Sequence, residues 1–216
     1  MIDIAERFDF DTISFASEWL ELPTKKDWQL KILVLTSVLA ENNLAYRGTL
    51  ANMREWLGIK QSTTANKGIQ EAIQKLEEKG YIFVKQEGRT YHISITNKGL
   101  RNKEIVKIRK QWVTTFKNYK ENITDISIDW LQLLRVFVYL YNRKYNNVLT
   151  TREIAESLDI SIETARKAIK VIEQCNLNGI IFKKQTIKQE VRNEQGEIFT
   201  YRNKGTDIAI MVMFKD

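Results

Sequence analysis

Three cations share one face of an expected helix in the C-terminal half of the chain. Arg166, Lys167 and Lys170 are spaced so that they lie together on the outer side of a helix from Ser161 to Cys175. Arginine can form two hydrogen bonds to O6 and N7 of guanine, and lysine can contact a base edge or a phosphate. A solvated basic helix that binds nothing has the same pattern. The chemistry offered by these residues is therefore recognition of a polyanion.

A second expected helix, from Ser62 to Lys79, offers amides and hydroxyls instead of a cationic face. Amide side chains pair with N6 and N7 of adenine, and a threonine methyl can contact the thymine methyl. This helix is better suited to reading bases than to holding phosphates. Gly68 lies inside it, at a cost of about 1 kcal/mol relative to alanine. The candidate contact residues are Thr63, Thr64, Asn66, Lys67, Gln70 and Gln74.

Two expected β-hairpins provide further cations. The first joins the runs 81–85 and 90–96 through a loop that contains Gly88, and the second extends from Ile180 to Phe214. Cations on such hairpins commonly contact phosphates and add affinity more than sequence information. The second hairpin is equally suited to be a dimerisation arm. The candidate residues are Lys85 and Arg89 in the first hairpin and Lys183, Lys184, Lys188 and Arg192 in the second.

Residue types that support catalysis or metal binding are scarce. One histidine, His92, and one cysteine, Cys175, cannot build a usual zinc site or an intrachain disulfide. The sequence has no G-x-x-x-x-G-K-[ST] phosphate-binding loop. Asp9 and Asp11 resemble a metal-binding carboxylate pair, but no third acid lies in a recognisable strand. We expect no enzymatic activity, no metal and no cofactor.

The helix that carries Arg166 belongs to a segment that occurs twice. Residues 49–59 and 150–160 match at an offset of 101, and each is a short amphipathic helix ending in Leu-(Gly/Asp)-Ile. A second helix follows each copy, and the closing segments 76–80 and 172–176 match at an offset of 96. The first copy is therefore expected to carry about five extra residues at its turn. Two β-like runs follow each pair of helices.

Further expected elements divide the 216 residues into two domains, a size for which each half can bury a core. Apolar helices from Asp27 to about Asn42 and from Asp129 to Tyr145 precede the two copies. Between them, a helical stretch from 101 to 120 has an apolar stripe at spacings of three and four residues, formed by Ile105, Ile108, Trp112, Val113 and Phe116. The expected boundaries are an acidic lead-in at 1–23, domain one at 24–99, a basic connecting helix at 100–124 and domain two at 125–216.

Charge is distributed unevenly along the chain. The lead-in has six acids and one arginine, a net charge of −5, so the remainder of this +7 chain carries +12. A basic body with a pI near 9.3 is typical of polyanion binders, although AT-rich genomes also encode lysine-rich proteins. The lead-in is expected to pack its aromatics on domain one and to compete with DNA for the basic surface. These aromatics are Phe8, Phe10, Phe15 and Trp19.

The order of helix, tight turn, helix and β-hairpin is that of a winged helix-turn-helix. Residues 25–99 and 125–214 resemble this superfamily, and Leu149–Ile169 resembles the helix-turn-helix of many bacterial regulators. The layout is similar to that of plasmid replication initiators with two winged helices. The resemblance implies an α+β fold, mainly α with β-hairpin wings, in which two such domains in tandem are joined by a basic helix.

These observations favour a cytoplasmic, sequence-specific double-stranded DNA-binding protein, such as a transcriptional regulator of a bacterium or mobile element. Its two unequal helices would read adjacent major grooves, which favours an asymmetric or directly repeated site. One alternative is a factor for plasmid or phage replication initiation or DNA processing. Another is an interaction subunit of a chromosome-condensing complex, which the basic charge disfavours. A homodimer through the connecting helix or second hairpin is possible, and a membrane partner is not expected because no apolar run reaches 18 residues.

Overall fold

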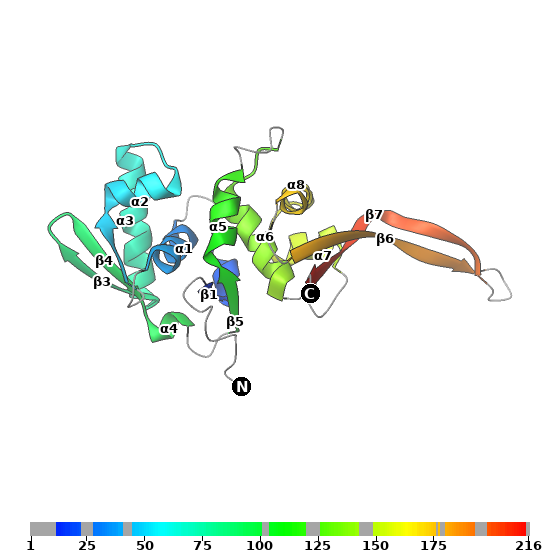
Figure 1. The fold of residues 1–216 in the computed structure, drawn as a ribbon, viewed down its shortest axis with the longest axis horizontal. Helices are drawn as coiled ribbons and strands as arrows, with labels where there is room; N and C mark the ends of the chain where they lie inside the picture. The colour runs from blue at the N-terminus through cyan, green and yellow to red at the C-terminus, as the bar shows by residue number, and fades with distance from the viewer. Residues whose placement is uncertain are drawn as a thin grey trace. The chain divides into compact units, whose positions relative to one another are not determined.

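Helices and small antiparallel sheets alternate along the chain, which places it in the α+β class (Figure 1). Contacts between residues divide it into two units, 1–114 and 115–216. The computed structural model describes residues 12–22, 28–40, 45–100, 104–119, 126–142, 149–175 and 177, together with the backbone of 180–192 and 198–214. Among these residues, no helix combines the length and the apolar character needed to cross a membrane.

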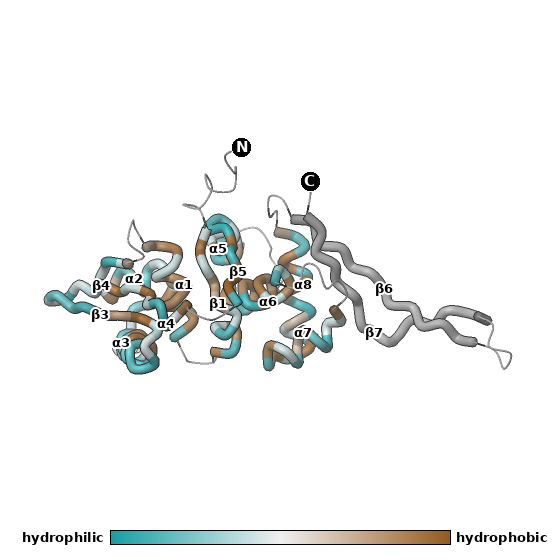
Figure 2. Tube along the Cα trace, turned by 90° about the horizontal axis from the view of Figure 1, so that it is seen from below, coloured by the Kyte–Doolittle hydropathy of each residue, from teal (hydrophilic) through white to brown (hydrophobic). Residues whose placement is uncertain are grey.

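The core of the first unit is built around α1 (Gln29–Leu39), which packs against α2 (Leu50–Leu57), α3 (Thr63–Glu78) and a three-stranded sheet. A helix that is apolar on most sides has to be enclosed by other elements. In Figure 2, α1 is accordingly largely brown, whereas α3 carries long teal stretches. The buried residues of α1 include Leu30, Ile32, Leu33, Val34 and Leu35.

The three-stranded sheet has the order β2-β4-β3 and is antiparallel throughout. Its strands are β2 (Ala45–Thr49), β3 (Ile82–Glu87) and β4 (Thr90–Ile95). The predicted hairpin is confirmed by β3 and β4. They are joined by a two-residue turn in which Gly88 has a φ of 60°, a conformation that glycine adopts without strain. Strand β2 was not predicted.

Part of the acidic lead-in belongs to the fold of the first unit. β1 (Thr12–Ala16) leads into a 3₁₀ helix, η2 (Ser17–Glu21), and pairs antiparallel with β5 (Ile105–Arg109). Phe15 and Trp19 are fully buried, and their ring centroids are 5.2 Å apart. The expected packing of these two aromatics is confirmed. Phe8 and Phe10 lie outside the described residues.

The predicted single helix from 101 to 120 is wrong. Within this stretch the structure has strand β5 followed by α5 (Lys110–Lys117), and α4 (Asn97–Leu100) precedes them. Residues 105–109 alternate between exposed and buried positions, with Val106 and Ile108 inside. Ile105 and Ile108 fit a helical period, but pairing with β1 satisfies the backbone, leaves Ile105 exposed and buries Val106 and Ile108 at a period of two.

The second unit consists of three helices and a long hairpin. α6 (Trp130–Asn142) and α7 (Thr151–Ser157) both pack against α8 (Ile162–Gln174), and the hairpin is formed by β6 (Ile180–Arg192) and β7 (Ile198–Phe214). The predicted helices and hairpin are confirmed to within a few residues. Phe116 joins this core through Phe137, with ring centroids 5.1 Å apart.

The extra residues of the first copy lie mostly in its second helix. The α2–α3 pair has helices of 8 and 16 residues, whereas the α7–α8 pair has helices of 7 and 13. Counted from the equivalent residues Gly58 and Asp159, the turn spans 58–62 in the first pair and 159–161 in the second, so only two of the extra residues lie there. The prediction of about five additional residues at the first turn is therefore wrong.

Candidate nucleic-acid interface

Side-chain and backbone hydrogen bonds cap both ends of α2 and the start of α3. Thr49 and Asn52 form a capping box at the start of α2, in which the Thr49 N–H donates to Asn52 Oδ1 at 2.9 Å. Helix α2 ends at Gly58, which has a left-handed φ of 68°. The Ile59 N–H then returns to the Arg54 carbonyl at 2.9 Å, as in a Schellman motif. The Ser62 hydroxyl caps α3 by accepting from the Ala65 N–H at 3.0 Å.

The α7–α8 pair repeats this arrangement. The Thr150 N–H donates to Glu153 Oε2 at 2.7 Å in a second capping box. Asp159 has a left-handed φ of 50°, and the Ile160 N–H donates to the Ala155 carbonyl at 3.0 Å. The Ser161 hydroxyl then caps α8. Because the caps set where each helix begins, the sequence repeat is also a repeat of local geometry.

Helix α8 has the amphipathic division that its sequence predicts. Arg166, Lys167 and Lys170 are all exposed on it. Lys167 Nζ lies 3.7 Å from Glu163 Oε1, one turn earlier, so this acid moderates the cationic face. The opposite side is small and apolar where it meets the rest of the unit, and its buried residues are Ala165, Ala168, Ile169, Val171 and Ile172.

On α3, the candidate residues Thr63, Thr64, Lys67, Gln70 and Gln74 are exposed. Helix α3 also carries Lys75 and the acids Glu71, Glu77 and Glu78, so its net charge is −1, whereas the three cations and two acids of α8 give a net charge of +1.

Several of the α3 side chains have partners within the first unit. Asn66 is only partly exposed because its Oδ1 accepts from Arg54 of α2 at 2.8 Å. Gln70 Nε2 donates to the Tyr91 hydroxyl of β4 at 3.3 Å, and Gln74 Nε2 donates to Glu78 at 2.8 Å. Lys67 lies 3.8 Å from Glu71. A ligand of this face has to compete with these interactions.

Gly68 has a packing reason to lie inside α3. A Cβ at this position would come within 2.4 Å of the indole Nε1 of Trp28, which directly precedes α1. Lys31 Nζ lies over the same ring, 5.1 Å from its centroid, and forms a cation–π interaction with it. The glycine therefore lets the Trp28 ring lie against α3. Nothing in the local sequence pattern indicates this contact.

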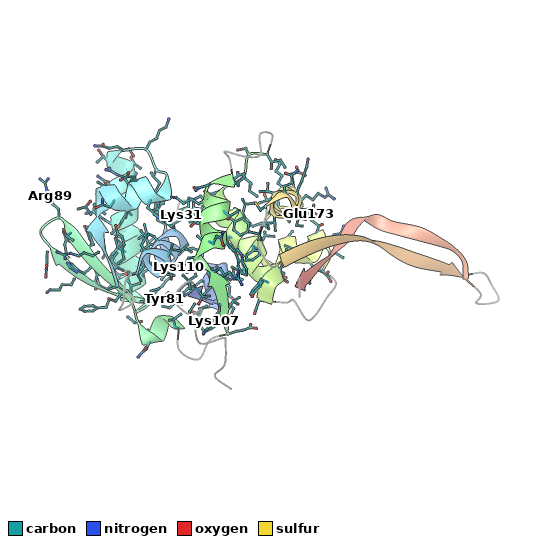
Figure 3. The ribbon with its side chains drawn as sticks, in the orientation of Figure 1. Lys31, Tyr81, Arg89, Lys107, Lys110 and Glu173 are labelled. Carbon is teal, nitrogen blue, oxygen red and sulfur yellow. The ribbon has the colours of Figure 1, made fainter. Side chains whose placement is uncertain are left out.

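In the first hairpin, Lys85 and Arg89 differ in their surroundings. Lys85 Nζ lies 2.7 Å from Glu87 Oε1, and this hydrogen bond and charge raise the pKa of Lys85 and lower that of Glu87. Arg89 is exposed at the tip of the hairpin (Figure 3). His92 Nε2 is 3.5 Å from Glu87 Oε2, too distant for a well-formed hydrogen bond, and occupies the strand position expected of a structural residue.

The cations of the second hairpin are placed by their backbone alone. Lys183, Lys184, Lys188 and Arg192 all lie on β6, but their side chains lie outside the described residues. The pairing of β6 with β7 is irregular between Thr186 and Lys188. The predicted tip at 193–196 also lies outside the described residues.

Arg135 is a buried cation that sequence reasoning missed. It lies in the apolar helix α6, is 4% exposed, and donates from Nη2 to the Leu158 carbonyl at 3.2 Å, where α7 ends. Burial lowers the pKa of its guanidinium, and the nearby charge of Asp159 opposes this effect. Arg135 thus stabilises the α7–α8 turn through a hydrogen bond from the buried side. Its signal in the sequence is a lone charge within an otherwise apolar helix.

The structure gives the catalytic candidates no further support. Within its described ranges, no group of three or more His, Cys, Asp or Glu residues is arranged to hold a metal ion. Asp9 and Asp11 lie outside those ranges. Cys175 follows α8 and is half-buried, and burial raises the pKa of its thiol, which disfavours the nucleophilic thiolate.

A scan against protein-family models and a search of curated proteins find no match to this chain.

Proposed function

We propose that this chain is a sequence-specific double-stranded DNA-binding protein with α3 and α8 as its two recognition helices. The carrying observation is the exposed cluster of Arg166, Lys167 and Lys170 on a helix whose opposite side is small, apolar and buried. An exposed helix with this composition fits the major groove and can contact both guanine edges and phosphates.

We assign the tandem winged-helix architecture as part of the same proposal. In the first unit, α1, β2, α2, α3, β3 and β4 follow one another in the order expected for this fold. In the second unit, α6, α7, α8 and the β6–β7 hairpin take corresponding positions along the chain. The matching caps at Gly58 and Asp159 support two equivalent helix-turn-helix motifs.

We assign unequal roles to α3 and α8. Helix α8 supplies most of the electrostatic attraction, whereas α3 contributes base contacts through Thr63, Thr64 and Gln70, after Gln70 releases Tyr91. Arg89 reaches a phosphate or the minor groove from the hairpin tip, as cations on wings commonly do. Two different readers on one chain fit an asymmetric or directly repeated site.

The biological role proposed is transcriptional regulation in the cytoplasm, without catalysis or a cofactor. Replication initiation or DNA processing on a plasmid or phage uses the same contacts and is the alternative favoured by the tandem layout. A homodimer through the second hairpin remains a prediction. A homodimer through the connecting stretch also remains a prediction, with α5 (Lys110–Lys117) as its helical part and residues 105–109 as a strand.

Fluorescence anisotropy across a salt series tests the proposal. The full chain is titrated against a random duplex and the DNA that flanks its own gene. Binding to the flanking DNA that persists at physiological salt, while the random duplex is released, is the expected result. No binding to either duplex at low salt would contradict the proposal and favour the interaction-subunit reading.

Variants test whether α8 is the helix that recognises DNA. Replacing Arg166, Lys167 and Lys170 with alanine should abolish specific binding. The matched control replaces Lys98, Lys107 and Arg109 with alanine. These residues are also exposed, and the control likewise removes one arginine and two lysines. Equal losses in both variants would mean that only the net charge of the chain matters.

A further inference from the structure

The β2-β4-β3 sheet has one face that the helices of its unit leave uncovered. The inward positions of the strands, such as Tyr46, Ile82 and Ile93, are buried. The alternate positions form three rows across the sheet, which we call the open sheet face. The rows are Phe83–Ser94–Ala45, Lys85–His92–Arg47 and Glu87–Thr90–Thr49.

Phe83 is the most prominent member of this face. It is 62% exposed, the largest exposure of any large hydrophobic side chain in the part of the chain that the structure describes. Its row is completed by Ser94 and Ala45, which are too small to cover an aromatic ring. A single exposed apolar residue is ordinary on a protein surface. Phe83 differs from such an isolated residue because a row of cations lies beside it.

That neighbouring row is cationic. Lys85 and Arg47 are exposed on either side of His92, two residues along their strands from the Phe83 row, or about 7 Å. Glu87 lies beyond them toward the tip and bonds to Lys85, and the charges of Lys85, His92 and Arg47 all lower the pKa of Glu87. With Arg89 at the tip, cations outnumber this one acid on the hairpin and its neighbouring strand.

We infer that the open sheet face binds single-stranded nucleic acid, with a base stacked on Phe83 and backbone phosphates on Arg47 and Lys85. An exposed aromatic ring beside a basic track is the combination that holds single strands without sequence preference. In duplex DNA the base faces are already stacked, so Phe83 has no partner there. The sheet face opposite α3 is thereby a second site, separate from duplex recognition, and it goes beyond the proposed function.

The test uses the full chain and a fluorescein-labelled oligo(dT) in anisotropy at low salt. Phe83→Ala should weaken oligo(dT) binding about tenfold, in the range measured for base–aromatic stacking. Phe83→Trp should retain binding, whereas Phe83→Leu should lose it as Phe83→Ala does. Because Phe83 is exposed, thermal unfolding of these variants should match that of the unaltered chain. The double variant Arg47→Gln and Lys85→Gln should reduce the salt slope by about 1.4, as expected for two phosphate contacts on a single strand.

Controls separate this site from the proposed duplex reader. Phe83→Ala should leave duplex binding unchanged, and the alanine variant of Arg166, Lys167 and Lys170 should leave oligo(dT) binding nearly unchanged. The inference is overturned if the unaltered chain does not bind oligo(dT), or if Phe83→Ala binds it normally. Full binding by Phe83→Leu also overturns it, because apolar burial, as in contact with a protein partner, would then explain the face without stacking.

Discussion

Gly58 and Asp159 are equivalent residues, 101 positions apart, that end α2 and α7 in the same left-handed conformation. Their φ angles are 68° and 50°, and each is followed by an isoleucine whose N–H returns to the preceding helix. Glycine adopts this conformation without strain, whereas a residue with a Cβ is strained in it. The two turns therefore have one geometry but different intrinsic stabilities.

The first prediction follows from this difference. Gly58→Ala should destabilise the protein by about 1 kcal/mol, from the backbone alone, because a Cβ there meets nothing within 4 Å. Asp159→Gly should stabilise it by about 0.5–1 kcal/mol. Urea unfolding measures both changes. Asp159→Asn is the control for the charge beside Arg135, and a stabilisation as large as that of Asp159→Gly would assign the effect to charge instead of backbone strain.

The second prediction concerns Gly68 and Trp28. In an unconstrained helix, Gly68→Ala gains about 1 kcal/mol, but here its Cβ would meet the Trp28 indole at 2.4 Å. Gly68→Ala should therefore destabilise the unaltered protein and stabilise the Trp28→Ala variant. A double-mutant cycle by thermal unfolding measures the coupling. Independent effects of the two substitutions would show that Trp28 can move aside without loss.

Long periodic segments of this chain could be predicted from its sequence, and short paired ones could not. The helices α2, α3, α7 and α8 have caps and an apolar face that specify them locally. Strand β2 is five residues long and depends on pairing with β4, which lies more than 40 residues further along the chain. Strand β5 was read as a helix because Ile105, Ile108 and Trp112 fit the helical period, whereas the pair that fits a strand is Val106 and Ile108, and only the partner β1 selects it.

The same division applies to the candidate interface. Exposure of Arg166, Lys167 and Lys170 could be predicted because the buried alanines and isoleucines of α8 fix its orientation. The bond between Gln70 and Tyr91 could not, since it joins a helix to a strand 21 residues away. Phe83 was read as part of a strand, but its exposure depends on which face of the sheet the helices cover.

The third prediction tests Arg135. Its guanidinium donates to the Leu158 carbonyl beneath the α7–α8 turn. Arg135→Met keeps an apolar stem but leaves this acceptor without its donor, so the variant should lose about 1–3 kcal/mol of stability in urea unfolding. Arg152→Met, on the exposed side of α7, removes the same charge and should change little. If Arg135→Met is more stable, the free-energy cost of burying the cation exceeds the stabilisation by its hydrogen bonds.

The fourth prediction concerns the ion pair between Lys167 and Glu163, whose atoms are 3.7 Å apart on the exposed side of α8. Glu163→Gln removes the acid that competes with phosphate for Lys167. Duplex binding at low salt should tighten about two- to fivefold, as expected from the strength of exposed ion pairs, and the gain should fade as salt rises. Glu104→Gln makes the same change of charge on the first unit. An equal gain from this control would remove any special role for α8.

The fifth prediction separates the two parts of the acidic lead-in. Deleting residues 2–22 should destabilise the first unit, because the deletion removes β1 together with the buried Phe15 and Trp19. Deleting residues 2–11 leaves β1 in place and removes four acids and one arginine. If this segment competes with DNA for the basic surface, its loss should tighten binding to random duplex at low salt while the unfolding temperature stays constant.

A variant that lacks only the four acids completes that test. Replacing Asp3, Glu6, Asp9 and Asp11 with their amides keeps the length of the segment and removes only its negative charge. This variant should bind random duplex as tightly as the 2–11 deletion if competition is electrostatic, and both gains should disappear as salt screens the attraction. Unchanged binding by both variants would limit the role of the lead-in to the packing of residues 12–22, where the aromatics already give it a structural purpose.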